Sequence, residues 1–288
     1  MNIAYPLQKS QDWLTQQWVI IWGRRIEPKE YQWLMGPFGE LGTIDDEFVY
    51  QLAKKENLIV KREVKSKGLL TSINQLELSE SDYKVLSEKV IDFYENTSNY
   101  NLDLNVKWNP FFRLFAILIN KLFSNRINQL NIPTKNIKNS EKITSEIITL
   151  TDLNTNEVKY TIWYRTSEVT KRVIYSGVYS SCILSSGEAC VKAVFPLPKG
   201  NATVIMRPSV GKNGELLLKS DGQKFGEPGF YFLLRDFKSR YWSQYIRSFK
   251  DYLKVGPNGS LLSAEQVLTL WNFQVLKFNY SISRKLLE

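Results

Sequence analysis

Five charged residues lie within or beside apolar, strand-like runs, where a buried charge needs a partner or a function. They are Arg165, Arg207, Glu227, Arg235 and Arg247. An unpaired charge costs free energy in an apolar environment, so these are the candidate ligand-binding residues. If several meet at one barrel mouth, their guanidinium groups would bind a carboxylate or phosphate through paired hydrogen bonds. The alternative is that each is an ordinary surface charge.

The chain contains no histidine. This absence excludes Ser-His-Asp and Cys-His nucleophile systems in their usual form, as well as metal sites that need imidazole. Carboxylate, lysine and tyrosine chemistry remains open. Glu227 and Asp236 are a candidate carboxylate pair, although nothing in their spacing places them together. We therefore assign no catalytic residue, no metal ligand and no cofactor.

The two cysteines, Cys182 and Cys190, bracket a short loop typical of a hairpin. They would cross-link if the two strands placed them opposite one another. Two free buried thiols are the alternative, and this is the interpretation that suits an intracellular chain.

A basic stretch without Asp or Glu runs from Leu104 to Ser140. Its centre, 111–130, is the most apolar segment of the chain and is predicted to be a helix that begins after Pro110. One interpretation is a core helix that packs against a sheet. The other is a peripheral helix on an anionic membrane, for which the contact residues would be Arg113, Lys121 and Arg126.

From residue 141 onward, short β-prone runs alternate with turns rich in Gly, Pro, Asn and Asp, which indicates an antiparallel meander. The stretch Cys190–Pro208 is typical, because two apolar runs flank a Pro-Lys-Gly-Asn turn. About ten such strands would form a barrel or a strongly curved sheet. The predicted strands are 143–151, 158–166, 172–184, 190–197, 202–207, 215–220, 229–236, 241–254, 261–270 and 273–282.

Residues 1–105 have a mainly helical pattern, including a predicted helix over 79–96 that Ser79 would cap. Tyr100–Trp108 alternates strictly and predicts a strand with one buried face. The predicted fold class is α+β, with a helical N-terminal part and a large antiparallel sheet or barrel packed on one long apolar helix. The predicted regions are 1–105 (helical), 106–140 (apolar helix and linker) and 141–288 (antiparallel β).

Four segments together resemble a family of uncharacterised bacterial proteins over about residues 90–282. They are FYENTSNYNLDLNVKWNPFFRLFAILINKLFSNRINQLNIP, CVKAVFPLPKGNATVIMRP, FGEPGFYFLL and LTLWNFQVLKFNY. This resemblance carries over no activity, cofactor or site residue. The plan of a basic helix and a curved sheet also looks like that of helix-grip lipid-binding proteins, and such an architectural similarity does not fix a function.

Three hypotheses follow. The first is a non-enzymatic protein that binds an apolar, acid-headed molecule such as a fatty acid, in a cavity between sheet and helix. The second is a peripheral membrane or interaction module that uses the stretch 104–140, and the third is a carboxylate- or tyrosine-based enzyme. The net charge of +9 favours anionic neighbours, but no nucleic-acid motif occurs and nucleic acid is not expected as a partner. No secretion signal or spanning helix is evident, which predicts a cytoplasmic protein.

Overall fold

The computed structural model of the protein describes residues 3–6, 8–40, 44–112 and 136–285. This part of the chain is mostly antiparallel β-structure, and its complete helices all precede residue 100, while residues 110–112 are also helical. The α-helices are α1 (Ser10–Trp22), α2 (Glu47–Glu56), α3 (Glu80–Val85) and α4 (Glu88–Glu95), and the 3₁₀ helices are η1 (Gln32–Leu34), η2 (Ile73–Leu76) and η3 (Thr97–Asn99).

The described strands form one continuous sheet. The first seven are β1 (Arg24–Ile26), β2 (Leu58–Lys61), β3 (Tyr100–Trp108), β4 (Ile137–Asp152), β5 (Val158–Ser167), β6 (Val173–Ile183) and β7 (Ala189–Leu197). The others are β8 (Gly200–Val210), β9 (Leu216–Lys219), β10 (Gly229–Arg235), β11 (Tyr241–Tyr245), β12 (Phe249–Asn258), β13 (Leu261–Leu270) and β14 (Phe273–Arg284).

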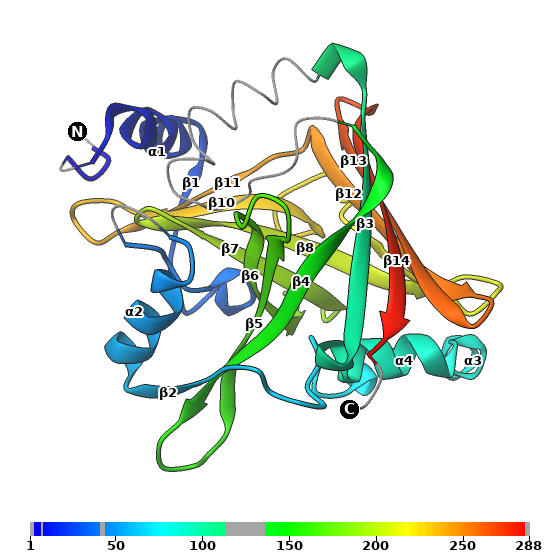
Figure 1. The fold of residues 1–288 in the computed structure, drawn as a ribbon. Helices are drawn as coiled ribbons and strands as arrows, with labels where there is room; N and C mark the ends of the chain where they lie inside the picture. The colour runs from blue at the N-terminus through cyan, green and yellow to red at the C-terminus, as the bar shows by residue number, and fades with distance from the viewer. Residues whose placement is uncertain (1–2, 7, 41–43, 113–135, 286–288) are drawn as a thin grey trace.

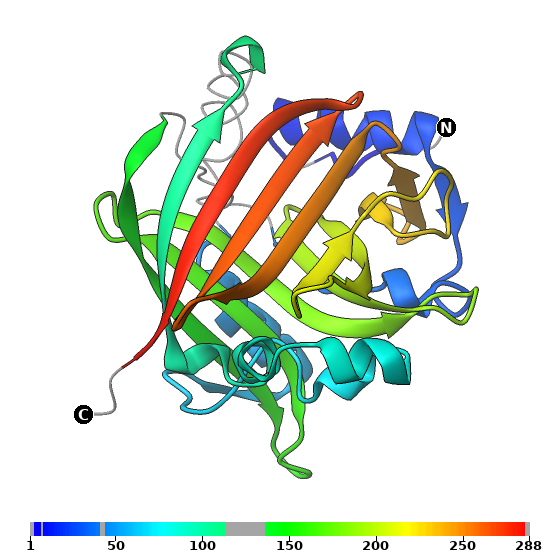
Figure 2. The same cartoon turned by 90° about the vertical axis from the view of Figure 1, so that its right-hand side faces the viewer.

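Within the described residues, the ten strands β3 to β9 and β12 to β14 close into an antiparallel barrel (Figures 1 and 2). Hairpin neighbours account for most of the ring. Two pairings between strands that are not consecutive complete it: β3 pairs with β14, and β9 pairs with β12. The predicted meander from residue 141 is confirmed, and β3 joins it as a further barrel strand.

Strand β8 is where the sheet branches. Its first half pairs with β10 and its last four residues pair with β9. Strands β10, β11 and β1 therefore extend beside the barrel as a separate wing, and β2 pairs with the far end of β4. The N-terminal segment thus becomes part of the same sheet.

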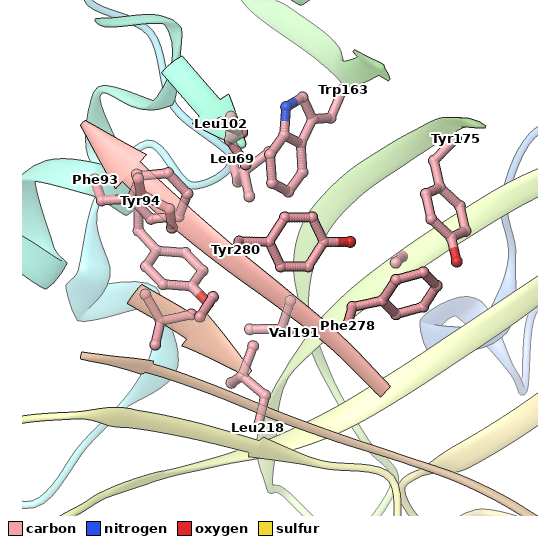
Figure 3. Close-up of a cluster of buried hydrophobic side chains, with 14 of the residues drawn as sticks. Leu69, Phe93, Tyr94, Leu102, Trp163, Tyr175, Val191, Leu218, Phe278 and Tyr280 are labelled. Atoms are coloured by element: carbon pink, nitrogen blue, oxygen red, sulfur yellow. The ribbon is translucent and has the colours of Figure 1, made fainter. Parts of the chain in front are cut away.

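The side chains of the barrel strands alternate between the interior and the outside, as the period of two requires. In β3, Leu102, Leu104 and Val106 are buried in the interior cluster, while the residues between them are more exposed. On β14, Phe278 and Tyr280 belong to the same cluster. Figure 3 shows part of this aromatic interior.

Short helices close one end of the barrel. Leu69 and Leu70 belong to the interior cluster, as do Ile73 of η2 and Val90 and Phe93 of α4. Figures 1 and 2 both show α3 and α4 across this end, and α1 lies toward the opposite end. The helical N-terminal region therefore includes a plug for one barrel mouth.

Other N-terminal elements cover the outer face of β4 to β8. Phe48, Val49 and Leu52 of α2 pack with Ile148 of β4 and Ile162 of β5. Trp33 and Leu34 of η1 pack in a separate cluster that contains Cys190, Ile205 and Tyr231. Because both faces of these strands are covered, their sequences are apolar on both faces.

The structure corrects the predicted fold class, because the described chain is mostly β and not α+β. The predicted helix over 111–130 lies almost entirely outside the described residues. The predicted helix 79–96 is two helices, α3 and α4. Ser79 does cap the first, at 3.1 Å from its Oγ to the backbone N of Asp82, but Ser87 is extended and donates its N–H to the carbonyl of Gly214.

The predicted strand 241–254 is also wrong, because it is two strands, β11 and β12, separated by a turn at Ile246–Ser248. The strand over 261–270 has the predicted bounds, and most others differ by one to three residues at their ends. Such end shifts are the usual uncertainty of strand boundaries.

Candidate functional site

A cavity of about 70 Å³ lies inside the barrel, toward the end that α4 closes. In this measure one water needs about 10–15 Å³, so the space holds several waters or a small organic molecule. Its wall is mainly apolar and aromatic. The polar groups that interrupt this wall are Tyr94, Arg165, Tyr175, Tyr179, Asp251, Gln266 and Tyr280.

Arg165 is the cation of the cavity. It alternates with Tyr164 on β5, so it points into the barrel with Trp163 and is only 6% exposed. Its guanidinium carbon lies 3.9 Å from the centre of the Trp163 ring and 4.7 Å from that of Tyr175. These are cation–π distances. One terminal nitrogen donates to the Tyr179 hydroxyl at 2.9 Å.

The guanidinium of Arg165 has no carboxylate partner among the described residues, and its Nε–H has no hydrogen-bond acceptor there. A buried donor without a partner is rare in folded proteins and costs about 1–3 kcal/mol. The N–H donors of the Arg165 guanidinium group are therefore not all paired with acceptors from the described residues.

Asp251 is the acid of the cavity. It lies on the inner face of β12, and one carboxyl oxygen accepts from the Gln266 amide at 2.7 Å, while the other is buried without a partner. Burial disfavours the charged form and raises the pKa of Asp251 to about 7. Near neutral pH this group is thus a mixture of a carboxylate acceptor and a carboxylic acid donor.

Four tyrosines complete the polar lining, and they are Tyr94, Tyr175, Tyr179 and Tyr280. Burial raises the pKa of Tyr280 to about 12, and burial also raises the pKa values of the other three. All four therefore stay protonated and able to donate a hydrogen bond. Figure 3 shows the Tyr280 ring at the centre of the aromatic cluster, with its hydroxyl directed toward Tyr175.

The cavity therefore combines aromatic walls with a cation, a titratable acid and neutral hydroxyl donors. Such a set is suited to a small anion with an apolar body, because the guanidinium can pair with the negative charge and the aromatic rings can pack against the apolar body. In the described part of the chain, no group of three acidic or thiol side chains is arranged to hold a metal ion. The chemistry available here belongs to Arg165, Asp251 and the hydroxyls.

The structure places only Arg165, of the five predicted ligand-binding residues, in this cavity. Arg207 lies outside the barrel and pairs with Glu188 and Asp221. Glu227 accepts the backbone N–H of Gln223 at 2.7 Å, and Arg235 is exposed at the end of β10. Arg207, Glu227 and Arg247 surround the loop 221–228 and do not reach the interior.

The candidate carboxylate pair is not assembled. Glu227 precedes β10 and Asp236 follows it, so the length of the strand separates them. Asp236 has a structural role, since it accepts from the backbone N–H of Lys238 and Arg240 and from the Trp242 indole N–H. These donors, with the Arg240 side chain, hold the pKa of Asp236 below its usual value.

Arg113, Lys121 and Arg126, the predicted membrane-contact residues, lie outside the described residues. Cys182 and Cys190 are directly opposite one another on β6 and β7, and both are free and buried. Burial raises the pKa of Cys182 to about 11, and it also raises that of Cys190. Both are therefore protonated at neutral pH and poor nucleophiles.

Sequence reasoning missed Asp251, Gln266 and the four tyrosines. A signal for Asp251 exists, because Asp251, Leu253 and Val255 share one face of a predicted strand and a charge on that face is unusual. For the tyrosines there is no local signal, since Tyr175 and Tyr179 on β6 meet Tyr280 on β14 only when the barrel closes, and Tyr94 comes from α4.

Comparisons with known proteins add one distant relative. The chain is 25% identical over 229 residues to the uncharacterized membrane protein YndJ of Bacillus subtilis. The match covers 79% of this chain and 40% of that protein, so the chain spans less than half the length of this relative. No protein-family model matches the chain.

No solved structure matches the chain either, so the architectural similarity to helix-grip proteins has no support from a structural match. No helix in the described part of the chain is long and apolar enough to cross a lipid bilayer. What the comparisons show is therefore a distant homology to YndJ, a bacterial protein whose name identifies it as a membrane protein.

Proposed function

We propose that the protein binds a small apolar molecule with an anionic head group inside the barrel, without transforming it. The head group would accept from the Nε–H and a terminal N–H of Arg165, and the body would lie against the aromatic wall. The Tyr179 hydroxyl, which already accepts from Arg165, keeps its own proton to donate to the ligand.

The observation that carries this proposal is the incompletely paired charge of Arg165. A charge moved out of water costs several kcal/mol unless an opposite charge or good hydrogen bonds replace the lost hydration. Here two aromatic faces and one hydroxyl are the observed contacts. An anion in the cavity would supply the missing counter-charge.

The size of the cavity sets the class of ligand. About 70 Å³ is too small for a long acyl chain, so the fatty acid expected from the sequence would require the barrel strands to move. A short-chain carboxylic acid is the closest match to this volume, and a single-ring acid needs a much smaller movement of the lining side chains than a fatty acid, since a cavity of about 150 Å³ holds benzene. Aromatic acids are favoured because Trp163, Phe195 and Tyr280 line the same space.

The first test compares an acid with its neutral ester. Titration calorimetry with sodium benzoate should give saturable binding, and methyl benzoate should bind at least tenfold more weakly, because it cannot form a charge-assisted pair with Arg165. Native mass spectrometry of the purified protein, followed by organic extraction, should recover a small organic acid. Equal affinity for acid and ester, or no binding together with a clean apo mass, would argue against the proposal.

A matched pair of variants locates the binding. Tyr179→Phe removes the hydroxyl that contacts Arg165 and should weaken benzoate binding about tenfold, by roughly the free energy of one hydrogen bond to a charged group. Tyr252→Phe is the control, because Tyr252 is the next residue after Asp251 and so points away from the interior. A similar loss in both variants would show that binding occurs elsewhere.

Asp251 favours a second candidate, an enzyme that uses the same cavity. A carboxyl with a pKa of about 7 can exchange a proton in either direction near neutral pH, which general acid–base catalysis requires. The extracted molecule separates the two functions. If it is returned unchanged after prolonged incubation with the protein, binding is the function, and a new mass that Asp251→Asn abolishes would favour the enzyme.

A further inference from the structure

Exposed aromatic side chains gather at the end of the barrel opposite α3 and α4. The three described tryptophans that are exposed are Trp18 and Trp22 on α1 and Trp271 in the β13–β14 turn. Phe273 follows this turn, and Phe111 lies near it, since Asn109 bonds to the backbone of Gln274 and Val275. Figures 1 and 2 show α1, the β13–β14 turn and the end of β3 at the same end.

Helix α1 is apolar on two faces. Val19 and Ile20 pack in a cluster with Leu234 and Trp242 of the wing. The outward face carries Leu14, Trp18 and Ile21, at the spacing of one helix side, and Leu14 and Ile21 are more than 60% exposed. A surface helix normally has a polar outer face, so the apolar outer face of α1 is unusual for a helix in contact with water.

The turn between β13 and β14 is unusual in the same way. Leu270 pairs with Phe273, which leaves the two-residue loop Trp271-Asn272, and both loop residues have positive φ (49° and 66°). Turns of this kind favour Asn or Gly, because a bulky side chain is disfavoured at positive φ. Trp271 is nevertheless 66% exposed. Too little of its side chain is buried to offset the conformational cost of its positive φ.

Cations lie beside these aromatics. A surface hollow is lined by Trp18 and Trp271 together with Arg247 and Lys250, and no carboxylate lines it. Among the described residues, neither cation has an ion-pair partner. Tryptophan prefers the interface between water and lipid, and basic side chains next to it favour anionic head groups.

We infer that this end of the barrel docks on an anionic lipid membrane. Trp22, Trp271 and Phe273 enter the head-group region, while Arg247 and Lys250 contact lipid phosphates. Only Phe111 belongs to the basic stretch 104–140 that the sequence singled out, so this is a different surface. It is also separate from the interior cavity, and the inference is independent of the ligand.

Vesicle binding tests the inference. The protein should co-sediment with vesicles of phosphatidylcholine and phosphatidylglycerol at 7:3, and bind at least tenfold more weakly to pure phosphatidylcholine or in 0.5 M salt. Equal binding to both vesicles, or no binding to either, would overturn it. Sedimentation velocity without vesicles should give a monomer. A dimer that uses this end and excludes vesicles would assign the surface to a second copy of the chain and overturn the inference.

A matched pair of double variants locates the surface. Trp271→Asn with Lys250→Gln should lower the affinity for anionic vesicles about tenfold or more, while thermal stability is kept or raised because Asn suits the turn. Tyr83→Ser with Lys84→Gln makes the corresponding change on α3 at the other end and should leave binding unchanged. Equal losses in both, or no loss in the first, would contradict the inference.

Discussion

Arg165→Met is expected to reduce the affinity for benzoate at least 100-fold without lowering the stability of the ligand-free protein. The variant loses a charge-assisted pair with the carboxylate, and such interactions commonly contribute a few kcal/mol when buried. It also removes a desolvated cation whose Nε–H has no acceptor in the described structure. Met fills a similar volume, so we expect the free energy of unfolding to be unchanged or raised by about 1–3 kcal/mol.

Calorimetric titration and urea unfolding measure the two effects separately. Arg165→Lys keeps the charge but loses the planar fork, so it should show an intermediate loss of affinity. Arg207→Met is the matched control, because Arg207 is outside the barrel and pairs with Glu188. If Arg165→Met unfolds the ligand-free protein, Arg165 is a structural residue and the cavity is not designed for an anion.

Asp251→Asn is expected to stabilise the protein above pH 7 by up to about 4 kcal/mol. The pKa of Asp251 is about 7 in the folded state against 3.8 for an ordinary aspartate. A tenfold difference in proton affinity between the folded and unfolded states corresponds to about 1.4 kcal/mol of stability. The folded state holds the proton more tightly, so stability is complete below pH 4, falls as pH rises toward 7, and stays constant above it.

Unfolding by urea between pH 4 and pH 8 tests this pH dependence. The wild type should lose stability across this range, and Asp251→Asn should be nearly flat. Glu215 affects stability in a different pH range. Backbone N–H groups and Lys254 lower its pKa to about 2, so its contribution to the free energy of unfolding is lost only as the pH falls below 4.5. Asp103→Asn, on β3 facing away from the interior cluster, is the control. Parallel curves for wild type and Asp251→Asn would contradict the assigned burial of the acid.

Much of the barrel can be predicted from the sequence because its strands are short and end at recognisable turns. Strand β3 is an example, since its alternation gives the correct bounds and the correct buried face. The break between β11 and β12 cannot be seen locally, because Ile246, Arg247 and Ser248 include no Gly, Pro, Asn or Asp to mark the turn. The break between α3 and α4 depends on a bond from Ser87 to Gly214 in a distant loop.

The candidate site is harder to predict because its two halves, on β5–β6 and on β12–β14, are brought together only by barrel closure. In β5, Trp163 and Arg165 point inward while Ile162 points outward, and both faces are buried. The run Tyr160–Arg165 therefore does not reveal which face lines the cavity. Arg165 stands out in the sequence as a charge next to apolar residues, but the same rule selects Arg207, which is outside.

The pairing of β3 with β14 has a consequence for the order of folding. Tyr100 lies opposite Arg284 and Trp108 opposite Leu276, so the first barrel strand must wait for the last. During synthesis the ring stays open until residue 284 has left the ribosome, and the edges of β3 and of the growing sheet remain unpaired. Pairings between strands that are so distant in the chain form slowly. We therefore expect chaperone dependence and aggregation during expression to respond most to changes in β14.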